Sequence, residues 1–230
     1  MQANATARRG LSPPPYLLLI FPAVTFMVLM YGYPFLSSVL RSFVNAQGEF
    51  SFENYGKTID LYLKDIGFTL AVTILSTAVS AVLAILLAVY LRLRQNPISR
   101  ALAALYKIPI FIPFVVVAQM MNSFLAPHGI LNLALAKLNV INLEHPLQLF
   151  SFYGLTFGFV WKMIPFSTLI IHGGFQMIDN SYIEAARSCG AGLGRVITRV
   201  LIPMNRPSIL VALVLVYSQI VGTFTLPYML

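Results

Sequence analysis

The sequence predicts an all-helical protein that crosses a membrane several times. Of its 230 residues, 58% are hydrophobic and only 10% are charged, whereas soluble domains carry about 25% charged residues. A chain of this size cannot bury so much apolar surface in a core of its own. Uncharged runs longer than the ~20 residues of a spanning helix recur along it. Such runs are too long for barrel strands, so we expect a helical bundle.

Five apolar runs are expected to span the membrane, within one domain that covers residues 1–230. The first run is longer than the apolar part of a secretory signal, about 7–15 residues, so we expect an uncleaved span that starts near Pro13–Pro15. The chain stops without a polar flank, and we expect a sixth span beyond Leu230. The five runs are Leu11–Leu40, Ile66–Leu91, Ile108–Ala136, Leu147–Ile178 and Pro207–Leu230.

Basic residues in the connections predict the orientation, because cytoplasmic loops are enriched in Lys and Arg. Ten lie on the side of the N-terminus and four on the other side, so the N-terminus is expected in the cytoplasm. The net charge of +8 is therefore attributed to topology rather than to nucleic-acid binding. The single cysteine, Cys189, excludes an internal disulfide and fits a reducing compartment. The ten are Arg8, Arg9, Arg92, Arg94, Arg100, Lys107, Arg187, Arg195, Arg199 and Arg206; the four are Arg41, Lys57, Lys64 and Lys137.

A polar stretch, Glu184–Pro203, separates the last two apolar runs. Ser181 and Glu184 have the spacing of a capping box, which predicts a helix that begins at Ser181. Gly190 is expected to end this helix in a left-handed conformation. A second amphipathic helix should follow, and Pro203 should mark the entry to the last span. The stretch is thus expected to form a helix, a glycine turn and a second helix on the cytoplasmic surface.

The polar stretch could be a solvated loop, a nucleotide site or a docking surface. A plain solvated loop is disfavoured, because long loops in compact proteins usually have a function. The glycines at Gly190, Gly192 and Gly194 suggest a nucleotide site, but their spacing is not G-x-G-x-x-G, no strand precedes them, and the chain has no P-loop motif. A docking surface is favoured, because the small apolar patch of Ala185 and Ala186 suits a helix that fits a groove.

The same residues carry a resemblance to a known family. The EAA loop of the membrane subunits of binding-protein-dependent ABC importers reads E-A-A, three residues, glycine, nine residues and then I-x-L-P. This chain has Glu184–Ala186, then Gly190, and then Val200–Pro203. The glycine spacing matches, and the last block differs by Val for Ile and Ile for Leu. The chain therefore resembles a permease subunit of such an importer.

The resemblance implies a permease domain whose cytoplasmic coupling loop, about residues 179–203, docks on a separate ATPase. Glu184, Ala185, Ala186, Gly190 and Pro203 would form this loop. Two ATPase subunits would bind ATP and Mg, so the chain itself would be no enzyme and would hold no cofactor or metal. Further implied partners are a second permease subunit, identical or homologous, and a periplasmic or lipid-anchored solute-binding protein. The expected location is the bacterial inner membrane, with several passes.

A few polar residues at membrane depth are candidates for the solute pathway. Lys162 interrupts the fourth run, where a charge costs at least ~2.5 kcal/mol; it either faces the pathway, or snorkels or pairs with a backbone carbonyl. Pro165 is expected to kink that span. Gln219 and Thr223 in the last span either line the pathway or serve helix packing. The histidines show no metal-binding spacing.

The class of solute is less defined by the sequence. The segments around Gly190 and Leu226 resemble the polyamine, iron, thiamine and aminophosphonate branch of these permeases more than the sugar branch. No acid lies in an expected span, as a polyamine path would require, and Lys162 favours an anionic or zwitterionic solute. A sugar permease, an ATP-independent secondary carrier and a structural scaffold are the alternatives. A helix at His128–Ile141 is expected at the outer face, as a binding-protein contact or an interface anchor.

Overall fold

The computed structural model describes residues 16–229. Arg8, Arg9 and Pro13–Pro15, with the start of the first predicted span, lie outside these residues. In the described part all regular structure is helical, apart from one isolated bridge between Val44 and Phe50. This confirms the predicted all-helical class. The chain divides into two compact units, one up to Lys64 and one from Asp65 onward, which are described separately.

The first unit contains the first predicted span. Its helix runs through α1 (Tyr16–Met27), the π-helical turn η1 (Val28–Gly32) and α2 (Tyr33–Ser42), and Leu19–Ser42 is long and apolar enough to cross a membrane. A short connection with an aromatic cluster follows. The rings of Phe43, Phe50, Phe52 and Tyr55 lie 5.3–6.2 Å apart.

Helix α3 (Glu53–Leu93) has 41 residues and contains the second predicted span. Its length is about 60 Å at 1.5 Å per residue, twice the hydrocarbon thickness. The first turns are polar and include an ion pair between Glu53 and Lys57, with 2.6 Å between the charged atoms. The apolar part follows, and its buried side is lined by small residues such as Ser76, Ser80 and Ala84.

The third predicted span, Ile108–Ala136, is broken in the structure. Helix α4 (Pro97–Leu105), the 3₁₀ turn η2 (Ile108–Phe111), α5 (Phe114–Leu125) and α6 (Ile130–Lys137) follow one another. The prolines at 109, 113 and 127 explain the breaks, because each lacks a backbone N–H. Together α5 and α6 are long and apolar enough for a span. The predicted surface helix at His128–Ile141 corresponds to the shorter α6.

The centre of the second unit is a pair of helices, α7 (Phe152–Gln176) and α11 (Arg206–Val221). Helix α7 confirms the fourth predicted span. The last span is shorter than the predicted Pro207–Leu230, because α11 ends at Val221 and the short helix α12 (Thr225–Met229) packs on α5. Asn122 of α5 donates a hydrogen bond to the Met229 carbonyl at 3.3 Å. Residues 16–229 thus contain four candidate spans, or five if the bent pair that ends in α11 counts as one.

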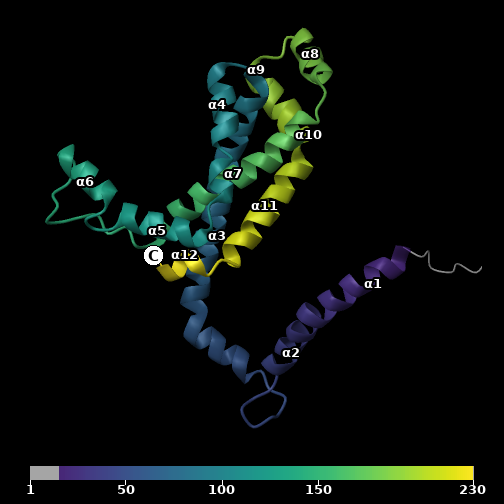
Figure 1. The fold of residues 1–230 in the computed structure, drawn as a ribbon, viewed down its shortest axis with the longest axis vertical. Helices are drawn as coiled ribbons and strands as arrows, with labels where there is room; N and C mark the ends of the chain where they lie inside the picture. The colour runs from purple at the N-terminus through teal and green to yellow at the C-terminus, as the bar shows by residue number, and fades with distance from the viewer. Residues whose placement is uncertain (1–15, 230) are drawn as a thin grey trace, which may run out of the picture. The chain divides into compact units, whose positions relative to one another are not determined.

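The second unit has two apolar cores, at opposite ends of α7. Near one end, α5, α7, α11 and α12 pack around side chains such as Met121, Phe159 and Leu226. Near the other end, α3 and α7 pack against the segment that connects α7 to α11. The side chains of this core include Ala88, Phe175 and Leu201. Figure 1 shows α4, α8 and α9 at this second end, and α5, α6 and α12 at the first. Helix α7 contributes to both cores, and it packs along α11 between them.

A close approach between α7 and α11 requires glycine at Gly174. A Cβ atom there would lie 2.0 Å from Asn205 Oδ1 and 2.2 Å from Ser208 Oγ. The adjacent Gly173 has nothing within 4 Å of such an atom. The two neighbouring glycines therefore form a matched pair for a test of this packing.

We expect Gly174→Ala to destabilise the protein by about 1–3 kcal/mol, because the added methyl group pushes the two helices apart. Gly173→Ala should be neutral or stabilising by up to about 1 kcal/mol, since alanine favours the helix. The apparent unfolding temperature of the purified protein in detergent measures both. Equal effects of the two substitutions would contradict the close packing.

Candidate functional site

The predicted coupling loop begins with helix α8 (Asn180–Ser188), which is capped by Asp179. Asp179 Oδ1 accepts a hydrogen bond from the Ser181 N–H at 2.7 Å. Hydrogen bonding from Ser181 lowers the pKa of Asp179, so the cap persists at neutral pH and is lost only as the pH falls through the lowered pKa. The predicted capping box at Ser181 is therefore wrong. The N-cap is instead Asp179, two residues earlier. Its carboxylate accepts the backbone hydrogen bond and lies at the positive end of the helix dipole.

The end of α8 follows the prediction. Gly190 has φ +77°, the left-handed region that favours glycine. The Gly190 N–H donates to the Arg187 carbonyl at 2.9 Å, and the Ala191 N–H donates to the Ala186 carbonyl at 3.0 Å. This pair of bonds is the Schellman motif. Ala186 and Ala191 also pack against the second core, so the turn is fixed by both hydrogen bonds and burial.

Helix α8 has one buried face and one exposed face. Ile183 is buried in the second core, whereas Tyr182, Glu184 and Ala185 are exposed. The exposed face is therefore available for a contact outside the chain, while the buried face attaches the helix to the spans.

The second half of the loop is a helix that bends sharply into the last span. It comprises α9 (Leu193–Val196), η3 (Ile197–Leu201) and α10 (Ile202–Met204), with Pro203 inside α10. The bend into α11 is 69°. At the bend, Asn205 is buried and its Nδ2 donates to the Ile171 carbonyl of α7 at 2.8 Å. The exit of the loop is thus anchored to α7.

The entry of the loop is anchored by Arg92, near the end of α3. Its Nε donates to the Phe175 carbonyl at 2.9 Å, and one terminal nitrogen donates to the Ile178 carbonyl at 2.8 Å and to Asn180 Oδ1 at 2.7 Å. One guanidinium therefore ties α3 to the end of α7 and to the first residue of α8. Sequence reasoning counted Arg92 only as a topology signal, because partners more than 80 residues away leave no local pattern.

Lys162, on α7, lies against the break in the third span. Its Nζ donates to the carbonyls of Pro109 at 2.7 Å, Ile110 at 3.3 Å and Ile112 at 2.6 Å. The residue is 8% exposed. Carbonyls freed by a helix break inside a membrane need partners within the protein. Of the alternatives predicted for Lys162, this geometry therefore matches pairing with backbone carbonyls.

A cavity of about 360 Å³ lies at the same place and is lined by Lys162, Phe166 and Gln219 as well as by residues 110–114. Two of the predicted pathway residues, Lys162 and Gln219, therefore meet in one cavity. Thr223 does not join them: its hydroxyl donates to the Gln219 carbonyl at 2.5 Å, and it lines a smaller cavity beside Thr73. Pro165 is buried inside α7 and lines neither cavity.

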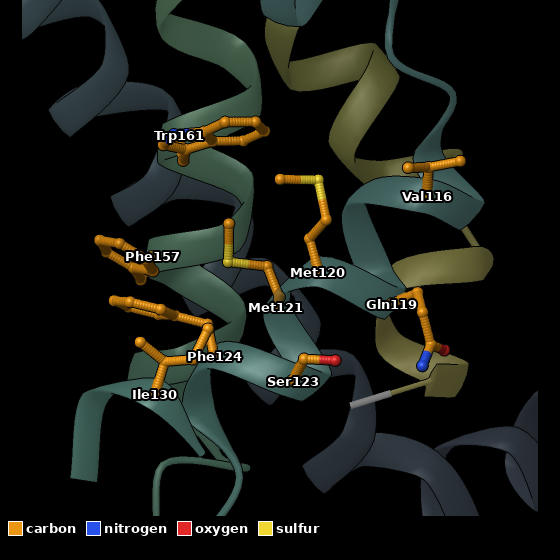
Figure 2. Close-up of a pocket in the computed structure, with 9 residues that line it drawn as sticks. All are labelled: Val116, Gln119, Met120, Met121, Ser123, Phe124, Ile130, Phe157 and Trp161. Atoms are coloured by element: carbon orange, nitrogen blue, oxygen red, sulfur yellow. The ribbon is translucent and has the colours of Figure 1, made fainter. Parts of the chain in front are cut away.

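A more apolar cavity of about 450 Å³ lies between α5 and α7. Figure 2 shows Phe157 and Trp161 of α7 with Met120 and Met121 of α5 next to them, and the ring of Phe124 directly beside that of Phe157. The rings of Phe124 and Phe157 are stacked, with centroids 6.2 Å apart. Gln119 and Ser123 are the polar groups of its lining. An apolar lining with few polar groups is typical of small-ligand sites.

The comparisons with known proteins agree with this architecture. Residues 80–230 match the family described as binding-protein-dependent transport system inner membrane component. The permease protein SmoG of the sulfoquinovosyl glycerol transport system of Agrobacterium fabrum is 28% identical, over 93% of this chain and 72% of its own length. The spermidine/putrescine transport system permease protein PotB of Haemophilus influenzae is 30% identical, over 45% of this chain and 36% of its own length.

A solved structure of a bacterial ABC transporter that imports the acidic polysaccharide alginate has the same fold. The TM-score is 0.76 at 20% sequence identity, with 94% of this chain and 79% of that chain covered. The chain therefore belongs to the family of binding-protein-dependent transport system inner membrane components, which are the permeases of ABC importers. The branch predicted from the sequence is not resolved, because both sugar-type and polyamine-type permeases are among the relatives.

We expect Arg92→Lys to weaken the link between α3 and the loop, because an ammonium cannot reproduce the forked contacts of the guanidinium. Transport per ATP hydrolysed, which measures the coupling role proposed below, should fall several-fold in reconstituted vesicles, while assembly with the proposed partners is kept. Arg41→Lys, the same change at an exposed arginine of α2, is the control. A coupling ratio equal to that of the control would show that the Arg92 contacts are dispensable.

We expect Lys162→Met to destabilise the protein by at least about 2 kcal/mol, because three carbonyls lose their shared donor. Lys107→Met, the same change at an exposed lysine just before η2, should have little effect. Thermal unfolding in detergent compares the two. If Lys162→Met leaves stability unchanged, the lysine does not support the broken span.

Proposed function

We propose that the chain forms one half of a translocation path and transmits the movement of an ATPase to it. The observation that carries this proposal is the geometry of helix α8. The helix is capped at both ends, its Ile183 side chain is buried, and Tyr182, Glu184 and Ala185 are exposed. A helix fixed in this way acts as a rigid lever, which coupling between two states requires. Two ATPase subunits, a second permease subunit and a solute-binding protein would complete the importer.

The lever would act on more than one span. Arg92 ties its entry to α3 and α7, and Asn205 ties its exit to α7 at the start of α11. A displacement of α8 would therefore reach the helices that line both cavities. ATP hydrolysis would take place on the partner subunit, and this chain would carry out no bond chemistry.

Gly190→Ala tests the lever. Alanine in the left-handed region costs about 1–2 kcal/mol, so the turn after α8 should change and the ATPase subunit should be lost or uncoupled. Gly192→Ala is the matched control, since Gly192 has φ −68° and open space around it. The ATPase retained on purification and the solute transported per ATP are the measurements. If both variants couple as the wild type does, the proposed role of this turn is wrong.

The solute is proposed to be small, polar and either polyhydroxylated or anionic. The cavity at the broken span offers the amide of Gln219 beside the positive charge of Lys162, whose N–H groups bind backbone carbonyls, and α5, α7 and α11 contain no carboxylate. Similarity over 93% of this chain to a permease for a sugar derivative supports the polyhydroxylated class. A polyamine, supported by the shorter PotB match, is the alternative. Stimulation of the ATPase in the assembly purified from native membranes, by maltose, aminoethylphosphonate or spermidine, distinguishes the classes.

Gln219→Leu tests the pathway without removing the contacts of Lys162. We expect the half-saturating concentration of the stimulating solute to rise at least about fivefold, as the loss of one hydrogen bond predicts. The control is Ser218→Ala, an exposed neighbour on α11 outside both cavities. Unchanged saturation in Gln219→Leu would remove this cavity from the solute path.

A further inference from the structure

A further cavity, of about 450 Å³, lies where α3 ends, between α4 and α7, away from the cavities described above. Figure 1 shows this end of α3 beside α4, at the same end of the unit as α8. Unlike the cavities described above, it is lined mainly by polar and basic side chains. Its polar lining consists of Arg94, Gln95, Ser99, Arg100, His172 and Gln176.

The positive charge of this cavity is not neutralised by the chain. Within residues 16–229 the only ion pair joins Glu53 and Lys57, so neither Arg94 nor Arg100 has a carboxylate partner there. In that part of the chain their guanidinium groups also make no hydrogen bond to protein atoms, in contrast to Arg92. Two guanidiniums with free donors beside a shared cavity favour an anionic ligand.

The chemistry of the lining selects phosphate among anions. A guanidinium presents paired N–H donors that match the oxygens of a phosphate group. The serine hydroxyl and the two amides of the lining add neutral donors for the remaining oxygens. Phosphate esters are also the anions that a basic cavity at a membrane surface meets most often, as phospholipid headgroups.

The position of the cavity fits the boundary between membrane and water. Arg94 follows the last residue of α3 directly, after the uncharged run Ile66–Leu91. It lies on the side with ten basic residues, which the sequence predicts to be cytoplasmic. Basic pockets between helices on that side are known to bind anionic headgroups. We propose that this cavity binds a phosphate group, supplied by an anionic phospholipid or by a free phosphate compound.

Native mass spectrometry of the assembled, delipidated transporter tests the proposal. The probes are phosphatidylglycerol, phosphatidylcholine and inorganic phosphate, each titrated separately. We expect Arg94→Gln combined with Arg100→Gln to weaken binding of the phosphate-bearing probe about twentyfold, since each basic residue contributes roughly a factor of five. Arg195→Gln combined with Arg199→Gln removes the same charge from exposed positions outside the cavity and should change binding less than about threefold.

The probes distinguish the two sources. A lipid headgroup is supported if phosphatidylglycerol binds tightly and phosphatidylcholine does not. This binding should be lost when Arg94→Gln is combined with Arg100→Gln, and kept in the control. Binding of inorganic phosphate with the same dependence on the two arginines supports a free phosphate compound. If no probe binds, or if both double variants lose binding equally, the cavity is not a phosphate site. None of these results depends on the transported solute or on ATPase coupling.

Discussion

The structure depends on how it satisfies the backbone carbonyls at the break in its third span. Prolines interrupt this segment between α4 and α5, and carbonyls freed at membrane depth have no water to bind. The ammonium group of Lys162 donates to three of them. The cost of burying one charge is thereby offset by hydrogen bonds that the break itself makes available. The same contact positions α7 beside the broken span and defines one wall of the cavity that also contains Gln219.

Helix α7 is held by polar contacts at three levels along its length. Lys162 fixes it to the broken span, the Ile171 carbonyl accepts from Asn205 at the start of α11, and the Phe175 carbonyl accepts from Arg92 of α3. Apolar packing alone gives little orientation in lipid, since side chains and lipid tails are equally apolar. These few directional contacts therefore specify how the spans are arranged. The glycine at Gly174, which allows close approach to α11, complements them.

Much of this architecture could be predicted from the sequence, because it follows from local patterns. Long uncharged runs define the spans, and the position of Gly190 predicts a left-handed turn. The N-cap at Asp179 was missed because Ser181 also satisfies the pattern, and only geometry decides between two acceptors so close together. The break in the third span was missed because the run was defined only by its lack of charge, although Pro109, Pro113 and Pro127 are a local signal for it. The contacts of Arg92 and Asn205 link segments distant in sequence, so no spacing rule reveals them.

In its proposed role, the loop at residues 179–203 has to satisfy two opposite requirements. It must be rigid enough to transmit a displacement, yet its displacement must change the spans rather than break its own contacts. The structure separates these requirements in space. Rigidity resides in α8, through the cap at Asp179 and the turn at Gly190, whereas the polar connections to the spans are single side chains, Arg92 and Asn205, at its two flanks. Hydrogen bonds of this kind can tilt without being lost, so a rigid helix can move between two states while both ends stay attached.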